Sequence, residues 1–428
     1  MNVFRFSFRR ALGWAIAAGA FSMLSLAVPS PGQREPIRFN TAFEGASIGA
    51  VETIDETTFR VRIRGQQDER GRNRQATWYY FRMDHVAGRE ITVTLTDWEG
   101  EYNDIPGTVP MSPKLHPWVS EDGEHWRRVE EMIWDERAKE ATVKLRPVAD
   151  RVWIAHLEPY PFSRFLSLRD EIDRSPHARV ETIGKSAQGR DLHVITVTNF
   201  ETSDAEKRTV WLQARQHAWE TGTSFTMEGA LRFVVSDDPR AQALRDRTIF
   251  RFMPMVDPDG SATGGVRFNA NGYDLNRHWD RIDLRDKAVL RAMPESWYVK
   301  KSIVGWLGAG QRIDLLVNLH NTRSEFLDSA VDEEPARASV QRLFDRLVRD
   351  THFDPYRPPG YGGKSATMLV LWKELRVPVV LMELRTEPGR KSATQPTAAE
   401  RIEFGAQLIA AMADAVQPPA IETGEPSQ

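Results

Sequence analysis

The sequence predicts an α/β protein in which an antiparallel β-sandwich domain precedes a domain built on a mostly parallel sheet with helices on both faces (α/β/α). Residues 36–160 contain short segments of alternating polarity separated by Gly, Asn, Asp and Pro, which is typical of a sandwich. In residues 161–416, helical patterns alternate with short apolar runs, and this alternation predicts a parallel sheet. A chain of 428 residues is long enough for both domains.

Within the first domain, five segments alternate apolar and polar residues, and we expect each to form a strand. They are residues 57–63, 77–83, 89–97, 141–147 and 151–157. Six of the thirteen tryptophans also lie in this domain. We interpret them as core and edge packing rather than as a sugar-binding platform.

The second domain has four segments with helical periodicity, separated by apolar runs that we expect to be buried strands. The helices are predicted at residues 163–175, 224–235, 336–350 and 398–416, and the strands at 191–199, 209–215, 248–255, 313–319 and 378–382. Residues 417–428 are rich in proline and polar side chains, so we predict a disordered tail.

Residues 1–33 have the layout of a secretory signal peptide. Three arginines among the first ten residues precede an uncharged stretch at residues 11–28, and the small residues Ser25 and Ala27 on either side of Leu26 could form a cleavage site. The stretch is also just long enough for an uncleaved N-terminal anchor. We therefore expect export to the periplasm or beyond the cell, with membrane contact only through this segment.

Charge and cysteine content exclude several classes of function. The net charge is -3 and the sequence pI is near 6.4, so no electrostatic footprint for nucleic acid is present. The chain has no cysteine, which excludes disulfides and thiolate zinc sites. Any metal ion must therefore bind to histidines and carboxylates.

Four polar residues follow or close predicted buried strands: His217, Glu220, His320 and Glu383. The carboxyl ends of parallel strands meet at one crevice, so these side chains are expected to lie together. Two imidazoles and one carboxylate make a catalytic zinc set with an open fourth position, and a second carboxylate can serve as a base. A single histidine at a strand end is more often structural, so the inference depends on all four positions jointly.

Five motifs occur in the order found in a known enzyme family. They are HAWE, the PDG turn, GYDLNR ending at Arg277, LVNLH ending at His320, and MELR around Glu383. In this order they resemble the zinc carboxypeptidases of the carboxypeptidase A superfamily. IGKSAQGRDL is similar to that superfamily's strand-turn signature, and the EPYPFSR junction after an all-β segment resembles the cytosolic-carboxypeptidase-like branch. The resemblance covers roughly residues 40–415.

The resemblance implies a role for each matching residue. His217, Glu220 and His320 match the ligands of one zinc ion, and Asp274 matches the carboxylate that orients the first histidine. Glu383 matches the general base.

Three further residues match groups that bind the substrate. Arg267 matches the group that polarises the scissile carbonyl, and Asn276 with Arg277 matches the clamp on a terminal carboxylate. The family's mobile tyrosine corresponds to Tyr361, with Tyr356 as the alternative.

The sequence does not determine which C-terminal side chain the enzyme would prefer. The position that selects the departing side chain falls within residues 364–368. Lys364 there would favour an acidic residue, and Thr367 or Met368 would not. Asp257 stands where the family usually has asparagine, which we interpret as a turn effect.

The resemblance implies a zinc-dependent metallocarboxypeptidase that hydrolyses a C-terminal peptide or isopeptide bond of a peptide or protein. One alternative is a zinc amidase or peptidase that acts on cell-wall stem peptides or N-acyl amino acids. Another is a catalytically silent binding protein on the same fold. The presence of every ligand, the base and the arginine argues against a silent protein.

Overall fold

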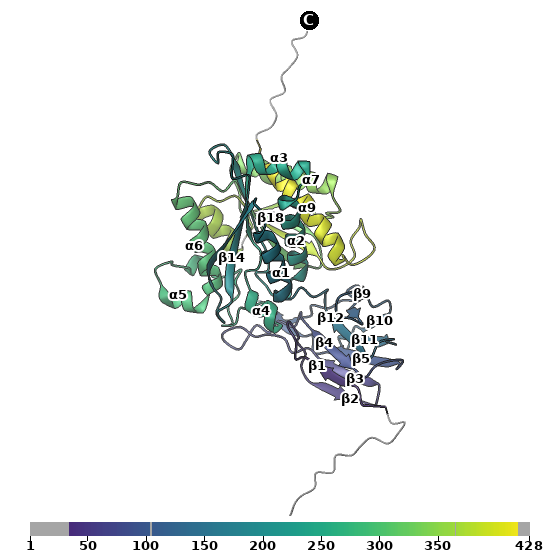
Figure 1. Ribbon diagram of the computed structural model, residues 1–428. Helices are drawn as coiled ribbons and strands as arrows, with labels where there is room; N and C mark the ends of the chain where they lie inside the picture. Colours follow the sequence, from purple (N-terminus) through teal and green to yellow (C-terminus); the bar gives the residue numbers. More distant parts are fainter. Residues whose placement is uncertain (1–33, 103–104, 364, 418–428) are drawn as a thin grey trace, which may run out of the picture. The chain divides into compact units, whose positions relative to one another are not determined.

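The computed structural model describes residues 34–102, 105–363 and 365–417 (Figure 1). The predicted signal peptide or anchor, Lys364, and the predicted tail beyond Gln417 lie outside the described residues. Among the helices of the described part, none has the length and apolar character needed to cross a membrane. The described residues from Ile37 onwards belong to one compact unit.

The N-terminal part contains two five-stranded sheets with the orders β1-β4-β12-β8-β9 and β10-β11-β5-β3-β2. The first consists of β1 (Arg38–Asn40), β4 (Tyr80–Asp84), β12 (Arg151–Ala155), β8 (Trp118–Ser120) and β9 (Arg127–Arg128). The second consists of β10 (Met132–Asp135), β11 (Glu140–Leu145), β5 (Ile91–Thr96), β3 (Thr58–Arg62) and β2 (Val51–Thr53). Paired strands in these two sheets are antiparallel except β3 and β5, which run parallel.

Both sheets contribute to one apolar core. The ring of Phe39 on β1 lies 5.1 Å from Phe59 on β3 and 5.6 Å from Phe81 on β4. Alternate residues of β5 and of β11 are buried in this core, as the period of two predicts. A two-stranded hairpin, β6 (Gly100–Tyr102) and β7 (Ile105–Thr108), forms a separate sheet.

The second part is built on an eight-stranded sheet of order β13-β14-β16-β15-β17-β20-β18-β19. Its strands are β13 (Ala178–Lys185), β14 (Asp191–Val197), β15 (Arg208–Gln213), β16 (Thr248–Met253), β17 (Leu315–Thr322), β18 (Phe326–Ser329), β19 (Gly360–Tyr361) and β20 (Val379–Arg385). The four inner strands are parallel, whereas β14 and β18 flank them antiparallel. The predicted α/β class is confirmed, with a mixed sheet.

Helices cover both faces of this sheet. Figure 1 shows α5 and α6 on one side and α1, α2 and α9 on the other. The α-helices are α1 (Phe162–Asp173), α2 (Thr221–Val235), α3 (Pro239–Arg247), α4 (Pro258–Thr263), α5 (Lys287–Ala292), α6 (Pro294–Gly308), α7 (Ala336–Asp350), α8 (Ala366–Leu369) and α9 (Ala398–Ala415). Short turns of other helix types occur at Trp279–Arg281 and Val370–Glu374.

Helices α2 and α9 pack backbone to backbone. A Cβ placed on Gly229 of α2 would lie 1.8 Å from the carbonyl oxygen of Ile402, and one on Gly405 of α9 would lie 1.9 Å from that of Thr226. Glycine at both positions therefore allows the two helices to approach closely. Because α2 begins directly after Glu220, this contact also fixes the start of α2 beside the sheet.

The four predicted helices coincide with α1, α2, α7 and α9, whereas α3, α4, α5, α6 and α8 were not predicted, and α6 is the longest of these. Its sequence contains Gly305 and Gly308 together with β-branched and aromatic residues, all of which lower helix propensity. Burial against the sheet stabilises α6 instead, because Trp297, Val299 and Ile303 are all buried.

Candidate active site

The loop between β15 and α2 holds its shape through a buried arginine. Arg215 has φ 59°, and its Nε donates to the Ala218 carbonyl oxygen at 2.9 Å while one Nη donates to Ser224 Oγ at 3.0 Å. The guanidinium therefore ties together both ends of the loop that carries His217 and Glu220. No sequence motif pointed to this arginine.

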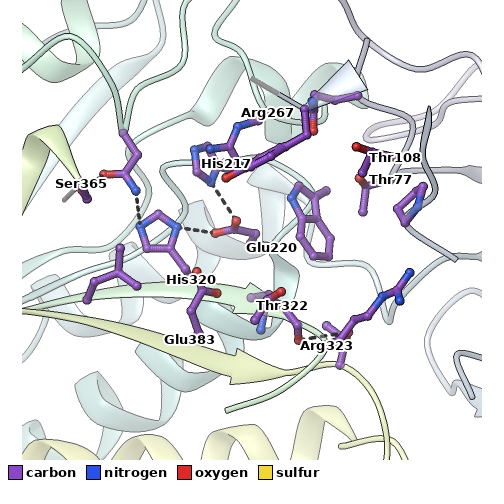
Figure 2. Close-up of a pocket in the computed structure, with 18 of the residues that line it drawn as sticks. Thr77, Thr108, His217, Glu220, Arg267, His320, Thr322, Arg323, Ser365 and Glu383 are labelled. Atoms are coloured by element: carbon purple, nitrogen blue, oxygen red, sulfur yellow. Dashed lines mark hydrogen bonds and ion pairs between the residues drawn. The ribbon is translucent and has the colours of Figure 1, made fainter. Parts of the chain in front are cut away.

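Three side chains converge at the carboxyl ends of the inner strands. Nδ1 of His217 lies 2.8 Å from Glu220 Oε1, and Nδ1 of His320 lies 3.0 Å from Glu220 Oε2 (Figure 2). All three are buried, and their ligand atoms lie within 4.8 Å of one another. Of the residues that the structure describes, these three are the group that could hold a metal ion. Two imidazole nitrogens and a carboxylate fit a zinc ion with an open coordination position.

The Asp274 carboxylate accepts hydrogen bonds from three donors. It binds His217 Nε2 at 3.1 Å, Arg267 Nε at 2.7 Å and the Asn276 backbone N–H at 2.9 Å. Burial raises the pKa of Asp274, but Arg267 and His217 outweigh it and hold that pKa well below its usual range. The charged carboxylate keeps Nε2 protonated and so leaves Nδ1 of His217 free for a metal.

The amide nitrogen of Asn276 lies 3.3 Å from Nε2 of His320. The amide oxygen of Asn276 accepts from Ser365 Oγ at 3.0 Å and from Thr367 Oγ1 at 2.7 Å. Two hydroxyls therefore orient the amide. Thr367 is fully buried behind Asn276, whereas Met368 lines the cavity.

Glu220 and His320 are held in the protonation states that a metal ion requires of its ligands. Burial raises the pKa of Glu220, but the two histidines outweigh it and leave that pKa lowered, so the carboxylate carries its charge. Burial lowers the pKa of His320 more than Glu220 raises it. The neutral imidazole, which is the form that binds a metal ion, is therefore favoured at His320.

Glu383 lies beside the ligand group because of strand register. It pairs with His320 across the parallel strands β20 and β17, so both side chains point to the same face of the sheet. Its Oε2 is buried and has no hydrogen-bond partner among the described residues. Burial raises the pKa of Glu383 well above its usual range, and the nearby Glu220 carboxylate raises it further. A carboxylate in this setting is suited to accept and release a proton.

Arg267 and Arg277 both contact Tyr102, a residue of the N-terminal part. The guanidinium of Arg267 lies over the Tyr102 ring, 5.2 Å from its centroid, and Arg277 Nη2 donates to the Tyr102 hydroxyl at 3.2 Å. Arg277 also donates to the Asn276 carbonyl oxygen at 3.0 Å. The two guanidinium groups therefore face the same space as the ligands.

These groups line one cavity of about 790 Å³ to which both parts of the chain contribute. In Figure 2, Ser365 lies on one side of the ligand group, and Thr77 and Thr108 lie on the other. Lining residues that sequence reasoning missed include Gln75, Thr77, Tyr102, Thr108, His156, Trp219 and Arg323. Most of them lie on the sandwich, far from the motifs in sequence, so only the tertiary structure could reveal them.

The two tyrosines expected from the resemblance lie elsewhere. Tyr361 contacts Gln341 through its hydroxyl at 3.4 Å, and the guanidinium of Arg337 lies over its ring. Tyr356 is 56% exposed. Neither is among the residues that line the cavity, whereas Tyr102 is.

Comparison with known families agrees with this arrangement. Residues 167–348 match the zinc carboxypeptidase model, and residues 39–157 match the model of the cytosolic carboxypeptidase N-terminal domain. The chain contains a zinc carboxypeptidase domain preceded by a cytosolic carboxypeptidase N-terminal domain. The predicted resemblance, including its branch, is thereby confirmed.

Individual relatives share this similarity at low sequence identity. Human cytosolic carboxypeptidase 2 is 27% identical over 309 residues, which is 67% of this chain and 33% of the relative. An uncharacterized protein of Zymomonas mobilis is 29% identical over 245 residues, which is 57% of this chain and 59% of the relative. The matches therefore span between a third and three fifths of these relatives.

Solved structures share the fold over nearly the whole chain. A metallo-carboxypeptidase from Burkholderia cenocepacia has a TM-score of 0.74 and 21% identity, with 89% of this chain and 99% of that chain covered. One from Pseudomonas aeruginosa, in complex with (2-guanidinoethylmercapto)succinic acid, has a TM-score of 0.73 and 21% identity, with 89% and 100% covered. These likenesses confirm the fold.

Proposed function

We propose that the protein is a zinc-dependent metallocarboxypeptidase that hydrolyses a C-terminal peptide or isopeptide bond. The main support is that one cavity is lined by the three metal-binding groups, by Glu383 with its unpartnered oxygen, and by the guanidinium groups of Arg267 and Arg277. We also propose that residues 36–160 and 161–416 act as two domains, with the cavity formed by both.

The chain's own residues can perform each step of the reaction. His217, Glu220 and His320 would hold the zinc ion, which would supply Lewis-acid chemistry to the attacking water and the carbonyl group. Glu383 takes a proton from the water and delivers it to the departing amine.

The arginines act on the substrate itself. Arg267 donates to the carbonyl oxygen as negative charge develops there. Arg277 binds the carboxylate of the departing residue, and its Nη1 donates to the Asn276 carbonyl oxygen. Asn276 completes the carboxylate clamp, and Ser365 orients its side-chain amide. Asp274 keeps both His217 and Arg267 in place.

The test uses purified, zinc-loaded protein and a library of peptides that differ only at the C-terminus. Release of single C-terminal residues, followed by mass, is the expected result. Cleavage inside the peptide would contradict the assignment, and release from stem peptides or N-acyl amino acids alone would favour the amidase alternative. Tight binding of the peptides without release of any residue would favour a catalytically silent binding protein.

We propose in addition that the protein is exported. The support is the sequence of residues 1–33, with its arginines followed by an uncharged stretch. Fractionation of cells that express the full chain, compared with a variant lacking residues 1–33, tests this. Recovery of both proteins in the cytoplasm would contradict export, and full-chain protein in the membrane fraction would indicate an uncleaved anchor.

A further inference from the structure

The hairpin β6–β7 of the sandwich domain is held firmly where it meets the active site. A Cβ on Gly100 would lie 2.3 Å from the Arg74 carbonyl oxygen, so only glycine allows this approach. The Glu101 N–H donates to the same carbonyl at 2.8 Å, and the Glu101 carboxylate accepts from the Asn73 N–H at 3.1 Å. Tyr102 follows directly, so an anchored strand determines its position.

Tyr102 contacts both arginines of the cavity. Arg277 Nη2 lies 3.2 Å from its hydroxyl oxygen, and Arg267 lies over its ring. A guanidinium group can only donate, so the tyrosine oxygen is the acceptor and its own O–H is left to donate. No described residue accepts a hydrogen bond from that O–H.

The position of this O–H suits a carboxylate. Tyr102 is 38% exposed and lines the cavity, so a substrate can reach its hydroxyl. A carboxylate bound to Arg277 has further lone pairs, and a hydroxyl beside the same guanidinium can donate to one of them. A hydroxyl that accepts a bond from a cation is also a stronger donor.

We propose that Tyr102 is a substrate-positioning residue whose O–H donates to the terminal carboxylate that Arg277 binds. The sandwich domain thus completes the carboxylate site of the catalytic domain. The proposal rests on the proposed function, because it assumes a substrate with a free C-terminus. It places Tyr102 in the cavity, where the resemblance had suggested Tyr361 or Tyr356.

Binding is measured first, in a Glu383→Gln background that blocks turnover. Calorimetry compares one library peptide in its acid form and its amidated form, with and without Tyr102→Phe. The loss of a hydrogen bond to a charged group should raise Kd for the acid by roughly 10- to 100-fold. The Kd for the amide should change little, because the amide has no carboxylate to lose.

Kinetics in the otherwise unchanged enzyme provide the second measurement. Tyr102→Phe keeps the ring beneath Arg267, so KM for the acid peptide should rise while kcat stays within about twofold of wild type. Tyr102→Leu also removes the ring and should lower kcat as well. Tyr361→Phe tests the tyrosine that the resemblance suggests, and Tyr298→Phe, whose side chain does not line the cavity, is the matched control with KM and kcat unchanged. Zinc content and circular dichroism check that each variant is folded.

The outcomes separate this proposal from the proposed function. If the wild type releases C-terminal residues but Tyr102→Phe binds the acid as tightly as its parent, the role of Tyr102 is refuted and the function stands. If the wild type releases nothing yet Tyr102→Phe weakens acid binding alone, the function is refuted and the role of Tyr102 stands. An increase in KM for Tyr361→Phe instead of Tyr102→Phe would overturn the proposal.

Discussion

The side-chain oxygen of Gln66 lies 2.8 Å from the backbone nitrogen of Arg267. The same oxygen accepts from the N–H groups of Val266 and Phe268, each at 2.9 Å, and the Gln66 amide nitrogen donates to the Phe268 carbonyl oxygen at 2.7 Å. One amide from the N-terminal part therefore binds three consecutive residues of the loop that carries Arg267.

Gln66→Ala should loosen this loop and displace Arg267. We expect kcat to fall roughly 10- to 100-fold, as small displacements of catalytic groups do. Zinc content should not change, because the ligands do not depend on Gln66. Steady-state kinetics and metal analysis check this, with the exposed Gln242→Ala as control. A wild-type kcat would show that the loop holds its shape without Gln66.

Removal of one metal ligand should abolish zinc binding. His217→Ala loses one of the three ligands, so zinc affinity and activity should both be lost. His278, which lies near the arginine clamp and packs against Tyr273, provides the matched control. Metal analysis after dialysis should find zinc in His278→Ala only. One zinc per chain in His217→Ala would disprove the ligand assignment.

Glu383→Gln tests the base. Glu383 is not in the metal-binding group. The nearby Arg385 forms its ion pair with Glu325, at 3.9 Å, rather than with Glu383. We therefore expect zinc and fold to persist while kcat falls at least ~10²-fold. Weaker zinc binding would instead make Glu383 a fourth ligand, and full activity with lower stability would make it structural.

Arg277→Ala tests carboxylate recognition. Loss of a charge-assisted contact worth ~1.5–3 kcal/mol should lower kcat/KM for an acid substrate roughly 10- to 150-fold. Amidation of the substrate should cause a similar loss in the wild type, and the two losses should not add because they remove the same contact. Equal turnover of acid and amide by the wild type would identify an endopeptidase or amidase instead.

Asp257 should make stability depend on pH. It caps α4 by accepting from the Gly260 N–H at 2.9 Å, and burial together with Glu295 raises its pKa to about 8. Because the folded-state pKa is raised, this group's stabilising contribution is full below pH ~4 and is lost as pH rises towards 8.

Asp257→Asn keeps the cap and cannot ionise. We expect it to raise the melting temperature above that of the wild type at pH 8, with a smaller difference at pH 5. Thermal unfolding at the two pH values measures this. A difference that grows on acidification would show that Asp257 is charged in the folded protein.

The sequence was sufficient to predict that the residues within recognisable motifs lie close together. His320 and Glu383 could be placed together because parallel strands end at one edge, and strand register brings them side by side. Tyr102 and Gln66 could not be predicted, because each acts through a contact with residues more than a hundred positions away. Helix α6 was missed because burial, rather than local propensity, stabilises it.

The close contact of α2 with α9 joins the helix that follows Glu220 to the last helix of the described residues. Helix α9, Ala398–Ala415, is made after every ligand and after Glu383, yet it supports the helix that begins after Glu220. A ribosome-bound chain that lacks α9 therefore has all the site's chemical groups without the scaffold that brings them together. We therefore expect metal loading and hydrolysis to begin only after translation has passed this helix.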